Sequence, residues 1–209
     1  LIIFLVYIGL SIKDVRRVLN SIILFILSIL IINGQGFILN NFMSPKQKQR
    51  IETLINPNAD PLGSGWNITQ SKIAIGSGGL LGKGYLKGTQ TGLNFVPIQS
   101  TDFIFSVIGE EFGYLGSMFF IILYLIFLYR ILILSEAQKD RFARVFGYSV
   151  FSIFIFHFTV NVSMTLGLFP VIGIPLSFIS YGGSSLLSFS LLLFVFLKLN
   201  GVKSAILGR

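Results

Sequence analysis

Long apolar runs separated by short basic segments dominate the pattern of this chain. Three stretches contain no Asp, Glu, Lys or Arg: residues 18–45, 112–129 and 145–197. Each reaches or exceeds the roughly 18 residues that an apolar α-helix needs to cross a membrane, and the last is long enough for two such helices. The pattern therefore predicts an all-α protein, a polytopic bundle of transmembrane helices.

The ends of these apolar runs predict where each membrane span begins and ends. The opening run at 1–12 has about half the length of a span, so we interpret it as a truncated helix and the sequence as the carboxy-terminal portion of a longer protein. The run has no basic segment before it and no small-residue cleavage site after it. A signal peptide is therefore not expected. The other elements are expected as spans at 21–43, 105–132, 146–167 and 184–199, loops at 44–104 and 168–183, and a tail at 200–209.

The composition fits a membrane protein and excludes several other classes. The chain is 53% hydrophobic and 11% charged, with a mean hydropathy of +0.82, which is too apolar for a soluble domain of 209 residues. It has no cysteine, which excludes a disulfide framework, a thiolate nucleophile and a cysteine-based metal site. The net charge of +8 is spread over short segments between helices and forms no continuous basic surface, so we expect no nucleic-acid partner.

The basic residues also predict the orientation in the membrane. Ten of the 16 Lys and Arg lie in the turn at 13–17, the loop at 130–144 and the tail from Lys198, which the alternating spans bring to one side. Short loops rich in Lys and Arg stay in the cytoplasm, so the loops at 44–104 and 168–183 are expected to face outward. Both are rich in turn-forming residues, and irregular backbone near membrane depth must lie against protein or a wet cavity. We therefore expect the two outer loops to meet at one cavity.

A glycine cluster precedes a lysine in the stretch 70–84, which reads QSKIAIGSGGLLGKG. A phosphate loop of the Walker type is excluded, because its glycine spacing and its Ser or Thr after Gly-Lys are both missing. Two interpretations stay open. Either the glycines let backbone segments pack closely, or the amides of Gly78 and Gly79 join Lys72 or Lys83 in binding a diphosphate.

Three carboxylates, Asp102, Glu110 and Glu111, stand where the polar loop turns into an apolar span. Acids near hydrocarbon are costly and are therefore functional candidates. Asp102 either acts as a general base or caps the amino terminus of the helix. Adjacent helical positions point about 100° apart, so at most one of the two glutamates can share a site with Asp102. Glu110 would stand roughly 12 Å along a continuous helix, beyond the ~5 to 9.5 Å of glycosidase carboxylate pairs.

A single carboxylate suffices for a transferase whose donor carries a diphosphate, because that leaving group needs little protonation. No cluster of hard oxygen ligands accompanies Asp102, so no cofactor and no metal site are predicted, although a divalent metal stays compatible with the sequence. His157 stands alone in an apolar span and is interpreted as structural. Arg50 contacts solvent or headgroups by default and is also a candidate for phosphate binding.

The motifs taken together resemble the SEDS family (shape, elongation, division and sporulation). The Gly-Lys-Gly and Gly-Thr-Gln elements of this chain are similar to the elongation members of that family more than to the division members. The resemblance covers nearly the whole chain and is carried by Arg50–Trp66, Gln70–Gly79, Gly82–Gln90, Thr101–Gly113, Pro175 and Ser180–Ser184.

This resemblance implies a fold of ten spans, of which the chain supplies the remnant of the sixth and all of the seventh to tenth. It implies a peptidoglycan glycosyltransferase of the bacterial cytoplasmic membrane that polymerises lipid II for cell elongation and rod shape. The growing glycan would be held through undecaprenyl diphosphate, and a class B penicillin-binding protein would be the partner. Asp102 corresponds to the essential aspartate of the family. Substrate contacts are expected from Arg50, Lys72, Gly78, Gly79, Lys83, Thr101, Glu110 and Ser184.

One departure from the family is visible before Asp102. Relatives carry a glutamate after the loop proline and a histidine before Thr-Asp, whereas Pro97–Ser100 contains neither. The difference implies an altered activity or partner dependence.

Two other functions remain as alternatives. The first is a transporter that flips a lipid-linked cell-wall precursor and needs no base. The second is a scaffold without catalytic activity.

Overall fold

The computed structural model shows an all-helical protein. The chain divides into a unit at Leu1–Lys48 and a unit at Gln49–Arg209. The expected half span at 1–12 and, apart from Met43, the expected span at 21–43 lie outside the described residues. The residues that the structure describes are 43–56, 60, 63–93 and 95–207.

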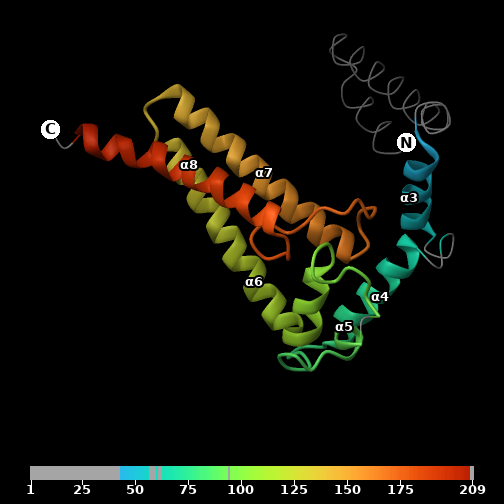
Figure 1. The fold of residues 1–209 in the computed structure, drawn as a ribbon. Coiled ribbons are helices and arrows are strands. Elements are labelled where there is room, and N and C mark those ends of the chain that lie inside the picture. Colours follow the sequence, from blue (N-terminus) through green and yellow to red (C-terminus); the bar gives the residue numbers. More distant parts are fainter. Residues whose placement is uncertain (1–42, 57–59, 61–62, 94, 208–209) are drawn as a thin grey trace, which may run out of the picture. The chain divides into compact units, whose positions relative to one another are not determined.

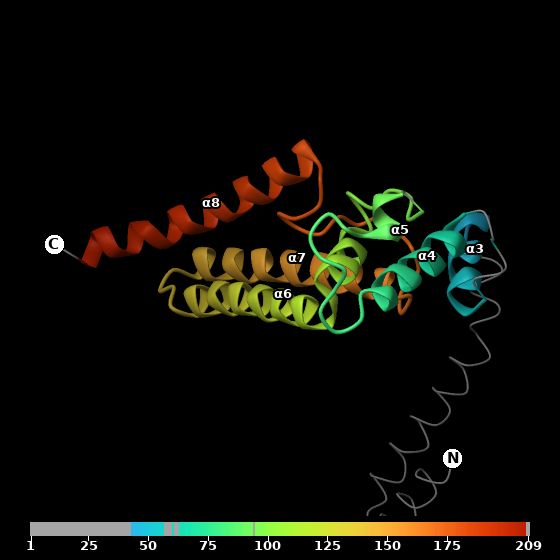
Figure 2. The same ribbon diagram turned by 90° about the horizontal axis from the view of Figure 1, so that it is seen from below.

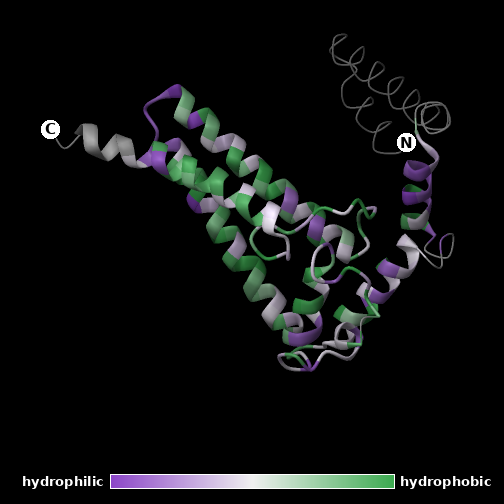
Figure 3. Ribbon diagram, viewed as in Figure 1, coloured by the Kyte–Doolittle hydropathy of each residue, from purple (hydrophilic) through white to green (hydrophobic). Residues whose placement is uncertain are grey.

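Three long helices form the apolar part of the fold. They are α6 (Ile104–Glu136), α7 (Arg141–Thr165) and α8 (Gly183–Leu207), as Figure 1 shows. By length and composition α6, α7 and the Gly183–Gly201 part of α8 can each cross a membrane. Hydrophobic residues predominate along these three helices, whereas hydrophilic residues are concentrated in α3 and in the turn between α6 and α7 (Figure 3). The predicted class, a polytopic helical bundle, is confirmed.

Helices α6 and α8 extend beyond the spans expected at 105–132 and 184–199, whereas α7 begins before the span expected at 146–167 and ends at Thr165, inside it. Charged residues end an apolar run, but they do not end a helix, because backbone hydrogen bonds do not depend on apolar side chains. Long basic side chains at the end of a span can also extend to the headgroups. Helix α7 therefore begins at Arg141, where Asp140 caps it by accepting a hydrogen bond from the Ala143 amide at 3.1 Å.

Helices α6 and α7 lie side by side (Figures 1 and 2), and α8 contacts α7. Lipid tails are as apolar as leucine, so van der Waals fit is the main attraction between such helices. Gly147 of α7 provides that fit, since a Cβ there would overlap Ser135 of α6 and crowd Phe196 of α8. The buried core comprises Tyr124, Leu128, Ile131, Val150, Phe154, Phe158, Leu176, Phe189 and Phe196.

The segment expected as an irregular loop at 44–104 contains three helices, so that part of the prediction is wrong. They are α3 (Pro45–Ile55), α4 (Ser64–Ser77) and α5 (Thr89–Gly92). Helix α4 forms because it buries one face, on which Ile68 and Ala74 are inaccessible to solvent. The buried Ser71 hydroxyl donates to the Thr165 carbonyl at the end of α7, at 2.8 Å. Asp60 supports the first turn by accepting the Ser64 amide at 3.0 Å.

Candidate functional site

Helix α6 is interrupted after its first two turns. Gly113 has φ 66° and ψ −161°, outside the helical region, so peptide groups on both sides of it lose their helical partners. The stretch 78–84, here called the glycine loop, replaces those partners. Four backbone hydrogen bonds do so: Lys83 N to Glu110 O at 3.0 Å, Gly84 N to Glu111 O at 2.9 Å, Tyr114 N to Gly79 O at 2.9 Å and Leu115 N to Leu80 O at 3.1 Å.

The glycines permit this close approach. A Cβ on Gly78 would overlap the Gly109 carbonyl oxygen, and a Cβ on Gly82 would overlap the backbone of Glu111. The amides of Gly78 and Gly79 donate to carbonyls of α4 at 3.2 and 3.4 Å. The packing interpretation therefore accounts for the glycine loop. These occupied amides give no support to the alternative in which they cradle a diphosphate.

We expect Gly82→Ala to lower the free energy of unfolding by about 1–3 kcal/mol, because the methyl group must displace backbone. The φ of +79° at Gly82 adds to the strain. Gly76→Ala is the matched control, since a Cβ there meets nothing within 4 Å and alanine favours a helix. The thermal unfolding midpoints of the two full-length variants in detergent check this. Equal midpoints would contradict the packing role.

Glu110 is fully buried beside the glycine loop, and protein donors surround its carboxylate. Lys83 Nζ lies 2.6 Å from Glu110 Oε1, and the amides of Gln90 and Thr91 each donate to the carboxylate at 2.8 Å. Lys83 also donates to Thr89 Oγ1 at 2.7 Å. The ion pair thus joins the glycine loop, α5 and α6, which gives both charged groups a structural task. Their substrate contacts stay predictions.

The segment that carries Asp102 is fastened to the loop before α8. Asn161, fully buried in α7, donates from Nδ2 to the carbonyl of Asp102 at 2.9 Å and to that of Ile174 at 2.8 Å. The Tyr181 amide donates to the Ser100 carbonyl at 2.8 Å. The segment before α6 and the loop before α8 therefore meet, and they hold the backbone of Asp102 between them.

The carboxylate of Asp102 has no hydrogen-bond or ion-pair partner within the described part of the chain. The side chain is half-buried, and its Oδ2 lies 3.2 Å from the position that a Cβ on Gly173 would take. Helix α6 begins at Ile104 with Phe103 as its N-cap, and no side chain caps it. The capping interpretation of Asp102 is therefore wrong, and the carboxylate is available to a ligand.

Backbone strain marks both segments around Asp102. Ile98 has a φ of 56° and Phe178 a φ of 68°. For side chains of this kind such a conformation costs about 1–3 kcal/mol, and it is concentrated at functional sites. The Ile98 carbonyl accepts hydrogen bonds from the amides of Thr101 and Asp102 at 3.2 and 3.1 Å. The strained turn at Ile98 therefore positions Asp102.

Two polar residues of α7, His157 and Asn161, contact backbone carbonyls of the loop before α8. His157 Nδ1 lies 3.1 Å from the Pro175 carbonyl oxygen, and its ring stands edge-on to Phe189, which agrees with a structural role. Asn161 was overlooked in the sequence. A signal was present, because a polar side chain within an apolar span is costly unless it has partners.

The remaining predicted residues are dispersed. Thr101 lies beside Asp102, whereas Arg50 of α3 and Ser184 of α8 are exposed and share no described contact with Asp102. Across the described ranges, no three His, Cys, Asp or Glu side chains come together as metal ligands.

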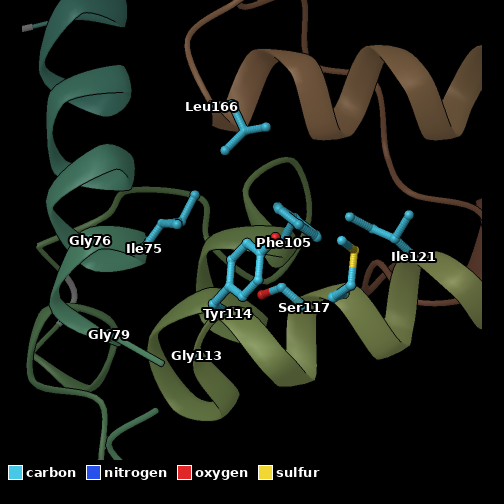
Figure 4. Close-up of a pocket in the computed structure, with 10 residues that line it drawn as sticks. Ile75, Gly76, Gly79, Phe105, Gly113, Tyr114, Ser117, Ile121 and Leu166 are labelled. Carbon is cyan, nitrogen blue, oxygen red and sulfur yellow. The ribbon is translucent and has the colours of Figure 1, made fainter. Parts of the chain in front are cut away.

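Lys72 lies exposed on α4 beside an apolar cavity. Its Nζ is 2.6 Å from the position that a Cβ on Gly167 would take, and the described residues provide no acidic partner for it. The cavity, of about 310 Å³, lies between the end of α4, both sides of the break in α6 and the end of α7 (Figure 4). Its side-chain lining is Ile75, Phe105, Tyr114, Ser117, Met118, Ile121 and Leu166.

Known proteins share this sequence and arrangement. Residues 1–204 match the family described as the cell cycle proteins FtsW, RodA and SpoVE. The chain is 48% identical to the peptidoglycan glycosyltransferase RodA of Treponema pallidum over 144 residues, which are 69% of this chain and 33% of that protein. It is 46% identical to the peptidoglycan glycosyltransferase MrdB of Escherichia coli over 145 residues, 69% of this chain and 39% of that protein.

A solved structure is also similar. Its title is "Structural coordination of polymerization and crosslinking by a peptidoglycan synthase complex", and it matches with a TM-score of 0.66 and 28% identity. The match covers 95% of this chain and 53% of that one. The chain spans only about 33 to 39% of the length of the two relatives named above, RodA of Treponema pallidum and MrdB of Escherichia coli.

Proposed function

Because the chain belongs to the family of the cell cycle proteins FtsW, RodA and SpoVE, which is the SEDS family, we propose that its complete protein is a peptidoglycan glycosyltransferase of the RodA type. It polymerises lipid II into glycan strands at the outer face of the bacterial cytoplasmic membrane. Relatives named peptidoglycan glycosyltransferase support the reaction class. One observation supports the assignment of the site: an unpartnered, half-buried Asp102 carboxylate on a backbone held by two outer loops.

In this proposal Asp102 is the general base. Its carboxylate takes the proton from a sugar hydroxyl of lipid II as the oxygen attacks the anomeric carbon of the glycan donor. A new glycosidic C–O bond forms, the bond from the anomeric carbon to the diphosphate oxygen breaks, and undecaprenyl diphosphate leaves as an anion. The proton then passes from Asp102 to water. No second acid is needed, which agrees with the commitment of Glu110 to Lys83.

Lys72 and the cavity beside it suit a lipid diphosphate. An exposed ammonium without a protein counter-charge attracts the diphosphate, and the apolar lining takes the first isoprene units. The amphiphile would then lie with its charge at the membrane surface and its chain among apolar side chains. Diphosphate also binds divalent cations, so a metal, if one assists, would arrive with the substrate.

We expect Lys72→Gln to raise the KM for lipid II about tenfold, because a charge-assisted contact to phosphate is lost. Lys87→Gln is the control, since Lys87 is another exposed lysine of the same outer segment. Initial rates of glycan formation by the full-length variants give both constants. Equal KM values for the two variants would remove Lys72 from the diphosphate site.

The partner in this proposal is a class B penicillin-binding protein, which crosslinks the strands. The similar solved structure is a synthase complex whose title joins polymerization with crosslinking, and this supports such a pairing. Membrane lipid surrounds the exposed apolar faces of α6 and α8.

The experiment that tests the function uses the full-length protein, with its partner, and purified lipid II in proteoliposomes. Glycan strands resolved by gel electrophoresis are expected in the presence and the absence of the partner's transpeptidase activity. Movement of lipid II across the bilayer without any polymer would instead support the transporter. Partner binding with neither outcome would support the scaffold.

A further inference from the structure

Glu111 is a buried acid that the mechanism above does not use. Its side chain is 7% exposed, and the described residues offer its carboxylate no hydrogen bond and no ion pair. Its neighbour Glu110 is also buried but is paired with Lys83. Because no described protein group donates to this carboxylate, its oxygens are available to accept hydrogen bonds from a ligand.

Glu111 belongs to the wall of a pocket of about 270 Å³. Ile104, Val107 and Glu111 follow one another at helical spacing and form its floor on the first turns of α6. Leu86, Gly88 and two residues of α5, Thr91 and Gly92, also line the pocket. The polar members of the lining are Thr91, Gln99, Ser100 and Glu111.

This pocket adjoins the Asp102 site along the chain. Ser100 lines the pocket, and its carbonyl accepts the Tyr181 amide that fastens the Asp102 segment to the loop before α8. Ile104, on the other side of Asp102, lines the pocket too. The pocket is therefore built from residues on both sides of Asp102 in the chain.

We propose that this pocket is a sugar subsite, in which the Glu111 carboxylate accepts hydrogen bonds from a hydroxyl or amide N–H group of the glycan substrate. The proposal rests on the proposed function and names the part of the substrate that the pocket takes. A sugar ring offers several donors to one carboxylate and an apolar face to Ile104 and Val107. A metal ion is a poorer match, because the pocket lining holds a single acidic side chain and no histidine.

One glycine leaves room for such a ring. Gly92 lines the pocket, and a Cβ there would meet nothing within 4 Å, whereas a Cβ on Gly88, which also lines the pocket, would overlap the Thr91 hydroxyl. The protein itself therefore tolerates a side chain at Gly92, while a sugar in the pocket would not. This provides a second variant that narrows the subsite without removing a protein contact.

The test measures the kinetics of glycan formation from lipid II by the full-length protein. Glu111→Gln is expected to raise the KM about tenfold and to leave kcat within about twofold, since a charged acceptor is lost from binding alone. Its thermal unfolding midpoint should stay unchanged, because the acid has no described protein partner. Gly92→Val should raise the KM similarly, and Glu52→Gln, on an exposed acid of α3, should change neither constant.

The possible outcomes distinguish a failure of the proposed sugar subsite from a failure of the proposed glycosyltransferase function. A polymerising enzyme whose KM is unchanged in both pocket variants would overturn the sugar subsite and leave the function standing. A KM effect of Glu111→Gln that disappears when Mg²⁺ is removed would identify a cation site and overturn it too. A wild-type protein that forms no glycan would overturn the function itself, whatever the variants do.

Discussion

Asp102→Asn in the complete protein is expected to lower the rate of glycan polymerisation by about 10²- to 10⁴-fold, the usual contribution of a positioned general base. Asparagine keeps the shape of the side chain and removes its basicity. The thermal unfolding midpoint should not move, because the Asp102 carboxylate has no described partner to lose. Initial rates with purified lipid II measure the effect.

A control at the other end of the bundle separates catalysis from a loss of charge. Asp140 caps α7, and asparagine caps a helix about as well as aspartate, so Asp140→Asn should keep both stability and rate. Binding of lipid II by Asp102→Asn should also persist. An Asp102→Asn rate within twofold of the wild type would remove the base from the mechanism.

Breaking the Lys83–Glu110 pair is expected to have the largest effect on stability. Lys83→Met leaves a fully buried carboxylate without its cation, and Glu110→Ala leaves the amides of Gln90 and Thr91 without an acceptor. Each change should lower the free energy of unfolding by about 3–5 kcal/mol, as for other buried pairs that lose one partner. Chemical unfolding of the full-length variants in mixed micelles checks this.

The double variant provides the control for this pair. Because one substitution has already broken the interaction, Lys83→Met with Glu110→Ala should cost less than the two single changes added together, by about 0.5–3 kcal/mol. Strictly additive losses would show that the two side chains act independently, and the joint structural role would then be withdrawn.

The long helices were predictable because their signal is local. A run such as 145–197, without a charged residue, leaves few structures that a membrane accepts. Helix α4 was missed because its buried face consists largely of small residues, including Ser71 and Ala74, which give a weak amphipathic pattern. The helix is stabilised by contacts with α6 and α7, and those partners lie far away in the sequence.

The break in α6 could not be predicted from the sequence either. Gly113 is one of 22 glycines, and the sequence does not mark it as the position where the glycine loop inserts. The two adjacent glutamates face different surroundings, as expected of neighbouring helical positions. Glu110 contacts Lys83 and α5, whereas Glu111 lines another pocket. Helical periodicity separates the two acids but does not identify the partner of each, because Lys83 and α5 lie about 20 or more positions away in the sequence.

A motif in the sequence pointed to Asp102 as a candidate, but it did not indicate which residues hold the Asp102 backbone. Asn161 lies 59 positions further along the chain, and it joins the carbonyl of Asp102 to that of Ile174. A polar residue in an apolar span indicates that a partner exists, without saying which. Contacts over such a separation need the fold.

The central claim is that Asp102 stands at a site on the outer face that lipid II occupies. The 209 residues contain no cysteine, so Asp102→Cys, with any cysteines in the rest of the protein replaced, places one thiol at the site. Labelling intact cells or sealed vesicles with a membrane-impermeant maleimide tests it. The account predicts labelling from the outer face and a several-fold slower reaction when lipid II is bound. Labelling from the cytoplasmic face alone, or at a rate that lipid II does not change, would contradict it.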